Sequence, residues 1–241
     1  MDTKEIKILG IDVGFTNTGW AIYDVLDDKF LKWGVIVNEQ IPVEDFRQRN
    51  QLQIDSDRIR KLARELYKIV SDNNPAGFVI ETGSGFQAAR ATYTMGLANG
   101  IVFSLISWIS LMDSQPRYID VVRPQSIKHH FAKKFGNKGT KQDISVAVKA
   151  RWPAIRPYLL KFTKARSYHI TDAMAAVGVS CDEESGLVRM LRSGHTALEN
   201  ARKKAIEEEE EKEKALVKFA KRLKSQQGEI EIGDETDGNN H

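Results

Sequence analysis

Short apolar runs near the N-terminus are spaced as in consecutive β-strands. Residues 6–12, 18–24 and 30–38 are apolar or alternate between apolar and polar positions, and turn-forming residues separate them. A short turn can join only antiparallel neighbours. The pattern therefore predicts three consecutive antiparallel strands at the start of the chain.

Further along the chain, helical and strand-like patterns alternate. Apolar positions recur at helical spacing over residues 55–71, with basic residues on the opposite face, and helical patterns return at about residues 141–151 and 168–179. Residues 77–81 and 117–122 are short β-rich runs. This order of elements predicts an α/β fold in which helices flank a mixed five-stranded sheet.

Residues 91–112 carry no charged side chain, and as a helix they would extend about 33 Å, which is enough to cross a bilayer. Scattered Thr, Asn and Ser residues, and the globular pattern on both sides, argue against a membrane span. We expect instead a helix that is buried on most sides and packs on the sheet and against a second subunit. Gly96 and Gly100 would permit that close approach.

Composition bounds the architecture and the cellular compartment. A chain of 241 residues with 41% hydrophobic residues has room for one domain and an appendage. Its single cysteine, Cys181, excludes an internal disulfide framework and a zinc site built on several thiolates. The N-terminal sequence has no apolar segment of the export type. We therefore expect a cytoplasmic protein.

Charge is distributed unevenly along the chain. Residues 1–205 hold 30 basic and 22 acidic side chains, a net charge of +8, whereas residues 206–241 hold 6 basic and 11 acidic ones. A basic body is typical of proteins that bind polyanions, although many other proteins share it. The composition shifts just beyond Cys181. We therefore predict a domain over residues 1–182 and a charged extension over 183–241, helical and then disordered.

Three carboxylates occupy the ends of predicted elements. Asp12 ends the first strand, Glu81 ends the 77–81 strand, and Asp172 lies near the start of a helix, three residues after His169. Each has an ordinary structural explanation as a turn former, a cap or an ion-pair partner. Their ordered combination instead favours convergence at one sheet edge. Such oxygen ligands suit Mg²⁺ or Mn²⁺ and phosphodiester hydrolysis by two metal ions.

Five ordered regions over about residues 6–180, the last of them represented by two sequences, resemble the RuvC-type Holliday-junction resolvases. The sequences GIDVGFTNTGWAIYD, FVIETGSGF and HITDAMAAV resemble the first, second and last acidic motifs of that family. TMGLANGIVFSLI resembles the helix that forms much of its dimer interface. RPQSIKHHF and GNKGTKQDISVAV resemble its basic region that contacts DNA.

The resemblance implies a ribonuclease H-like fold and a homodimer that makes paired nicks in a four-way DNA junction. By position, Asp12, Glu81 and Asp172 would be metal ligands, and His169 a ligand or the base for the attacking water. Two Mg²⁺ ions per active site are implied, with Mn²⁺ as a substitute. Lys141 is also assigned to the catalytic residues, and it would lie near the scissile phosphate.

Further residues are candidate DNA contacts. Lys128 would lie near the scissile phosphate together with Lys141, and Arg90 and Arg123 add positive charge near the second motif and the basic region. Phe86 is a candidate wedge that inserts into the junction, and its alternative is a loop aromatic folded onto the core.

Parts of the sequence also fit functions other than junction resolution. A sugar-kinase-like ATPase would explain Asp12 and Gly14, but it needs a duplicated domain for which the chain is too short. A ribonuclease H-like nuclease for flaps or RNA–DNA hybrids, and a non-catalytic junction-binding protein, both remain open. We expect the extension over residues 183–241 to be regulatory or to bind a protein partner.

Overall fold

The structure of the protein is a computed structural model that describes residues 5–38, 50–83, 88–113, 117–135 and 139–230. The chain forms two compact units, Met1–Arg192 and Ser193–His241. All of the strands belong to the first unit, and the candidate site residues that the structure describes belong to it too.

A mixed five-stranded sheet organises the first unit, in the order β3-β2-β1-β4-β5. The first three strands pair antiparallel, and β4 and β5 continue the sheet in parallel with β1. The sheet therefore confirms both the antiparallel start and the mixed five-stranded sheet predicted from the sequence. The strands are β1 (Lys7–Asp12), β2 (Asn17–Asp24), β3 (Lys29–Val37), β4 (Gly77–Glu81) and β5 (Tyr118–Val122).

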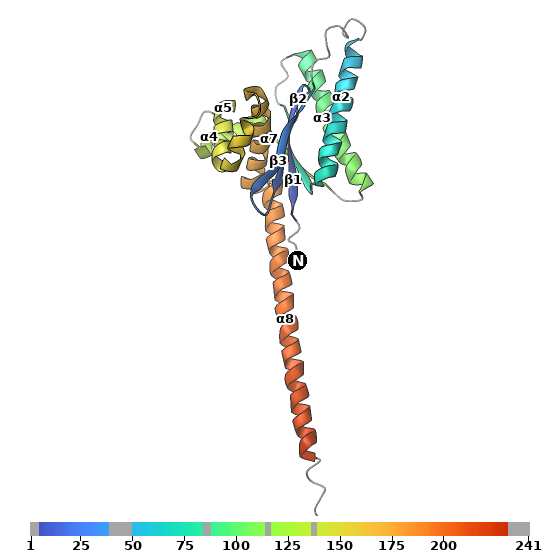
Figure 1. The fold of residues 1–241 in the computed structure, drawn as a ribbon, viewed down its shortest axis with the longest axis vertical. Coiled ribbons are helices and arrows are strands. Elements are labelled where there is room, and N and C mark those ends of the chain that lie inside the picture. The colour runs from blue at the N-terminus through green and yellow to red at the C-terminus, as the bar shows by residue number, and fades with distance from the viewer. Residues whose placement is uncertain (1–4, 39–49, 84–87, 114–116, 136–138, 231–241) are drawn as a thin grey trace, which may run out of the picture. The chain divides into compact units, whose positions relative to one another are not determined.

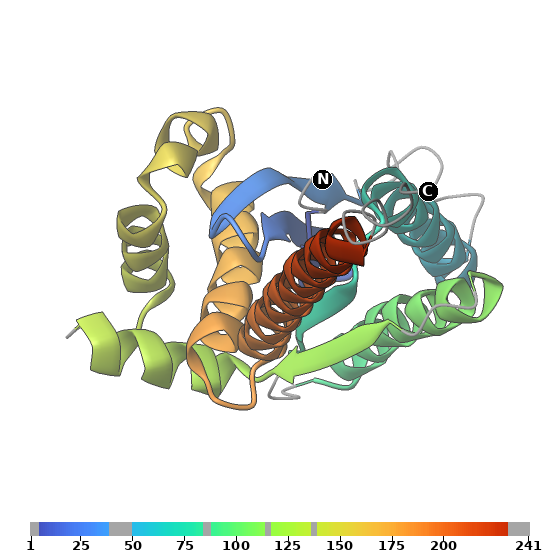
Figure 2. The same ribbon diagram turned by 90° about the horizontal axis from the view of Figure 1, so that it is seen from below.

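Helices cover both faces of the sheet. Figure 1 shows α2 and α3 on one side and α4, α5 and α7 on the other, and Figure 2 shows α5 (yellow) outside α7 (orange). Helices α4, η1 and α6 were not predicted as helices from the sequence. The helices are α2 (Gln51–Asn73), α3 (Ala89–Met112), α4 (Pro124–Phe135), α5 (Lys141–Arg151), η1 (Pro153–Ile155), α6 (Arg156–Leu159), α7 (Lys164–Asp182) and α8 (Leu187–Ile230).

Alternation along the strands creates two hydrophobic cores. Ile8 on β1 and Val79 on β4 point into the core under α4, α5 and α7. Leu9 and Ile11 point the opposite way, into the core under α2 and α3. Because side chains alternate between the two faces of a strand, Asp12, which follows Ile11, faces α7. The strand pattern alone thus decides on which face the first candidate carboxylate lies.

Helix α3 is less buried than the sequence predicts. It packs on the sheet and on α2, but only one stripe of it is buried in this chain: Ala98, Val102, Ile106 and Ile109. The expectation of burial on most sides is therefore wrong for the chain by itself, since α2 and the sheet cover only one side. Among the described residues, α3 is the one helix that is long and apolar enough to cross a membrane, judged by length and composition alone.

The first turns of α8 belong to the first unit. Leu187 and Val188 are buried in the core under α7, and the Arg192 guanidinium donates to the Val25 carbonyl oxygen and to the Tyr23 hydroxyl. From Ser193 the helix belongs to the second unit. The predicted domain boundary at residue 182 stays a prediction, as does disorder at the C-terminus, because residues 231–241 lie outside the described part of the chain.

Candidate active site

Strand register brings the first two candidate carboxylates together. Asp12 at the end of β1 is the direct partner of Glu81 at the end of β4 in the parallel pairing. Partners in a sheet project to the same face, so both carboxylates face α7. The two strands end at the same level of the sheet. The site can therefore form at the carboxyl ends of β1 and β4.

A glycine on the neighbouring strand brings the histidine to this edge. Gly19 on β2 is the antiparallel partner of Asp12. A Cβ atom on Gly19 would overlap the carbonyl oxygen of His169 on α7. The missing side chain therefore lets the α7 backbone approach the sheet, and His169 Nδ1 lies 2.7 Å from Asp12 Oδ2.

The third carboxylate lies on the same helix and pairs with a lysine from another one. Asp172 follows His169 by three residues and therefore shares its helix face. Its side chain is 7% exposed, and its Oδ2 atom accepts a hydrogen bond from Lys141 Nζ at 3.1 Å. Lys141 is the first residue of α5, where the Thr140–Asp143 capping box fixes the start of the helix. The sequence-predicted group therefore converges from four elements.

The site concentrates negative charge in a buried place. Burial, followed by the neighbouring carboxylates of Asp12 and Asp172, raises the pKa of Glu81 to about 8. Burial, followed by the Asp12 carboxylate, also raises the pKa of Asp172. Burial lowers the pKa of Lys141, but Asp172 and the other two carboxylates outweigh it, and the net shift is upward. Added positive charge would relieve this cluster.

The donor set suits a hard divalent cation. Glu81 Oε2 is buried and has no hydrogen-bond partner among the described residues, which is a costly state for a carboxylate oxygen unless a cation or water meets it. Within the described residues, however, no three carboxylate, imidazole or thiol groups are arranged so that they hold a metal ion as they stand. His169 and Lys141 engage oxygens of Asp12 and Asp172. A metal ion would therefore require these two contacts to rearrange.

The predicted DNA contacts differ in their exposure and in their partners. Lys128 on α4 is exposed and lowers the pKa of Glu81 through its charge, after Lys141. Arg123 is exposed between β5 and α4. Arg90 instead forms an ion pair with the buried Asp55 carboxylate of α2, at 2.5 Å. Phe86 lies outside the residues that the structure describes.

Sequence reasoning missed Gly19 as a positioning residue. The available signal was a glycine inside a strand-like run, which often marks a close backbone approach. The sequence did not reveal what approaches it, because the partner is α7, 150 residues further along the chain.

Comparison with known proteins adds evidence that is independent of this geometry. No family model matches the chain. It is 30% identical over 105 residues to the crossover junction endodeoxyribonuclease RuvC of Xanthobacter autotrophicus, covering 42% of this chain and 55% of that protein. It is 26% identical over 124 residues to the RuvC of Afipia carboxidovorans, covering 49% and 66%. The chain thus spans about half to two thirds of the length of these curated relatives.

Solved structures agree with the sequence matches. The structure of Thermus thermophilus RuvC superposes with a TM-score of 0.50 at 18% identity, covering 73% of this chain and 93% of that one. The same protein in complex with a Holliday junction substrate gives a TM-score of 0.50 at 19% identity, covering 73% and 92%. The chain is therefore similar in sequence to RuvC proteins and has the RuvC-type fold.

The RuvC-type fold confirms the resemblance that the sequence motifs carried. It also confirms the ribonuclease H-like sheet flanked by helices. The roles assigned to Asp12, Glu81, His169 and Asp172 stay predictions, since the matches name no residue.

Proposed function

We propose that this RuvC-type chain is a metal-dependent endonuclease that resolves four-way DNA junctions by paired nicks. The observation that carries the proposal is the convergence of Asp12, Glu81 and Asp172 at one sheet edge, with a buried and unpartnered Glu81 oxygen among them. The relatives named crossover junction endodeoxyribonuclease support the activity. As an enzyme of DNA recombination, it would act in the cytoplasm.

The three carboxylates would hold two Mg²⁺ ions, with Mn²⁺ as a substitute. When bound, such a pair of ions activates a water molecule and stabilises the leaving oxygen of a phosphodiester. Carboxylate oxygens are the ligands that both ions prefer. His169 would act as a further ligand or as the base for the attacking water.

Protein side chains would orient the reaction. Asp12 lies within hydrogen-bonding distance of His169 Nδ1, which fixes the orientation of the imidazole ring. Lys141 would move from Asp172 toward the scissile phosphate and offset the charge of the transition state. Lys128 and Arg123, which are exposed near this edge, would bind the DNA backbone.

We further propose that the enzyme is a homodimer formed through α3. A Cβ atom placed on Gly96 or Gly100 would meet no atom of the described residues within 4 Å, so this face of the helix is open toward the part of the chain that the structure describes. Trp108, Leu111 and Met112 on the same helix are exposed apolar residues. A second copy would cover them, and two active sites are needed to nick opposing strands.

The test is cleavage of branched DNA by the purified full chain with Mg²⁺. We expect a mobile four-way junction to be converted into nicked duplexes, and Asp12→Asn or Glu81→Gln to abolish cleavage while junction binding persists. Glu5→Gln is the matched control, because Glu5 is exposed and lies apart from the site. Wild-type cleavage by both site variants would refute the site assignment.

Parallel substrates separate this activity from its rivals. Four-way, three-way, flap, linear and RNA–DNA hybrid substrates are compared at one salt concentration, because affinity for nucleic acid depends on salt. Preferred cutting of flaps or hybrids would indicate another ribonuclease H-like nuclease. Junction binding without metal-dependent cutting by the wild type would indicate a non-catalytic binding protein.

A further inference from the structure

The edge strand β3 lies between two cavities. It pairs with β2 on one side and, among the described strands, has no neighbour on the other. A cavity of about 900 Å³ opens on the α7 side of this edge, toward η1 and α6. A second cavity of about 650 Å³ opens on the α2 side. Trp20, Lys32 and Phe162 line both cavities, which therefore meet around the free edge.

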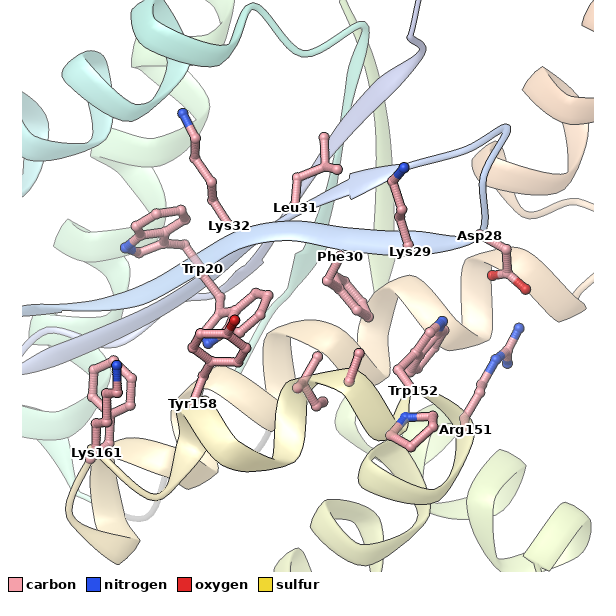
Figure 3. Close-up of a pocket in the computed structure, with 15 residues that line it drawn as sticks. Trp20, Asp28, Lys29, Phe30, Leu31, Lys32, Arg151, Trp152, Tyr158 and Lys161 are labelled. Carbon is pink, nitrogen blue, oxygen red and sulfur yellow. The ribbon is translucent and has the colours of Figure 1, made fainter.

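The first cavity is mainly apolar and aromatic. Figure 3 shows Phe30 pointing from β3 toward Trp152, with Tyr158 on the same side of the strand. The rings of Phe30 and Trp152 meet edge to face, with centroids 4.8 Å apart, and Trp33 and Tyr158 do so at 5.5 Å. These contacts form walls for an inserted apolar side chain rather than an open flat surface for stacking.

Two lysines at this edge are available to a partner. Of the basic residues that line the first cavity, Lys29 pairs with Asp27, and Arg151 pairs with Asp182. Lys32 and Lys161 make no ion pair within the described parts of the chain, and Lys161 lies over the Tyr158 ring at 5.4 Å.

The second cavity adds positive charge on the opposite face of the strand. Lys32, Lys61 and Lys68 line it, together with the carboxylates of Glu65 and Asp72. The two sides of the β3 edge therefore differ in chemistry. The α7 side offers aromatic walls, and the α2 side offers an excess of lysine.

We propose that β3 binds an extended acidic segment of a partner protein, which adds to the sheet as a further strand. Side chains of a strand alternate between its two faces. A segment in which apolar and acidic residues alternate would place the apolar ones in the aromatic cavity. Its carboxylates would face Lys32 and the lysines of α2. Main-chain pairing with the free edge would supply the remaining affinity.

This site is separate from the proposed active site and does not depend on junction cleavage.

A peptide fits these features better than single-stranded nucleic acid does. A nucleic-acid groove needs a track of cations for successive phosphates and exposed ring faces for the bases. Here two unpaired lysines line the main cavity, and its rings are engaged edge to face. A free strand edge pairs with a peptide backbone and offers nothing comparable to a sugar-phosphate chain.

The probe is a synthetic peptide of sequence Glu-Phe-Glu-Val-Glu-Phe-Glu, blocked at both ends and titrated into the full chain. Three of the four tryptophans, Trp20, Trp33 and Trp152, line the cavity, so intrinsic fluorescence reports on its occupation. We expect a saturable change in fluorescence. A peptide of the same composition without alternation should bind at least about tenfold more weakly, because its apolar and acidic side chains no longer lie on separate faces. A peptide N-methylated at alternate residues should be weakened as much, because it loses the main-chain hydrogen bonds of strand pairing.

Matched variants locate the site. Tyr158→Ala removes one wall of the cavity, and Lys32→Glu reverses a rim charge; each should weaken binding about tenfold. Tyr118→Ala is the aromatic control, because Tyr118 lies on the opposite edge strand and is 55% exposed, against 52% for Tyr158. Lys203→Glu controls for net charge. Circular dichroism and the unfolding midpoint check that each variant is folded.

The outcomes decide the proposal. It is supported if the alternating peptide binds and only the two cavity variants weaken it. It is overturned if the peptide gives no saturable change up to about 1 mM, which would leave less than about 4 kcal/mol of binding free energy. It is also overturned if the N-methylated peptide binds equally well, or if the cavity variants weaken binding of an oligothymidylate while the peptide does not bind.

Discussion

Gly19 on β2 lies so close to His169 that a single added methyl group would overlap the His169 carbonyl oxygen. Two parts of the chain that are far apart in sequence are thereby held in contact at the sheet edge. Since Gly19 is also the strand partner of Asp12, the same contact sets the distance between His169 and Asp12.

We therefore expect Gly19→Ala to displace α7 from the sheet. An overpacked core contact of this kind costs about 1–3 kcal/mol, and a misplacement of about 1 Å in an active site can lower the rate about 100-fold. Thermal unfolding and junction cleavage measure the two effects. Gly194→Ala is the control, because a Cβ atom there meets nothing within 4 Å. A variant of Gly19 with wild-type stability and cleavage would show that the close approach is unimportant.

The raised pKa of Glu81 predicts a stability that depends on pH in the absence of metal ions. The unfolded chain releases the Glu81 proton near pH 4.5, whereas the folded chain keeps it until about pH 8. The folded state binds more protons in this window, so the free energy of unfolding should fall as pH rises, by at most about 1.4 kcal/mol per pH unit. Urea unfolding in EDTA at pH 5 and pH 8 measures the difference. Glu81→Gln should reduce it, and an unchanged pH dependence in this variant would contradict the assignment.

Divalent cations should stabilise the folded protein at pH 8. A ligand that binds only the folded state raises its stability by about 2.7 kcal/mol at 100 times its dissociation constant. We expect Mg²⁺ or Mn²⁺ to raise the unfolding temperature of the wild type, and to do so much less in Asp12→Asn and Glu81→Gln. Differential scanning fluorimetry, with Ca²⁺ and matched ionic strength as comparisons, provides the measurement. An equal rise in all variants would indicate a non-specific salt effect.

Lys141 should affect cleavage more than DNA binding. Removing a group that stabilises charge in the transition state typically lowers the rate about 100-fold or more. We expect Lys141→Met to lower kcat by about this factor and to change junction affinity little, because it removes a single cation. Lys149→Met, on the same helix, is the control. A loss confined to binding would instead make Lys141 an ordinary phosphate contact.

The open face of α3 makes the proposed dimer testable without disturbing the monomer fold. Gly96→Leu or Gly100→Leu adds a side chain where no atom of the described residues is near, so the monomer fold should tolerate it. If a second copy packs there, the added bulk should raise the dimer dissociation constant at least about tenfold, equivalent to 1.4 kcal/mol. Sedimentation velocity measures the association, with Gly194→Leu as the control. Unchanged dimerisation would place the interface elsewhere, and a monomeric wild type would reject the dimer.

Much of the fold follows from local patterns in the sequence. The strand predicted at residues 77–81 has the same bounds as β4, and the helix predicted at residues 141–151 has the same bounds as α5. Both predictions succeed because hydrophobic periodicity and helix capping are local properties of the sequence. Helix α4 is not among the helices predicted from the sequence, although its first residue, Pro124, is well suited to the first turn of a helix.

The sequence by itself therefore determined the order of the elements, the five-stranded mixed sheet and the identity of the acidic residues. Only the tertiary structure decided how those residues meet. The register of β1 with β4 places Asp12 beside Glu81, Gly19 admits α7, and Lys141 reaches Asp172 from another helix. The same structure left α3 open on one face and β3 with a free edge between two cavities. These relationships depend on contacts between residues far apart in the chain, which local periodicity does not record.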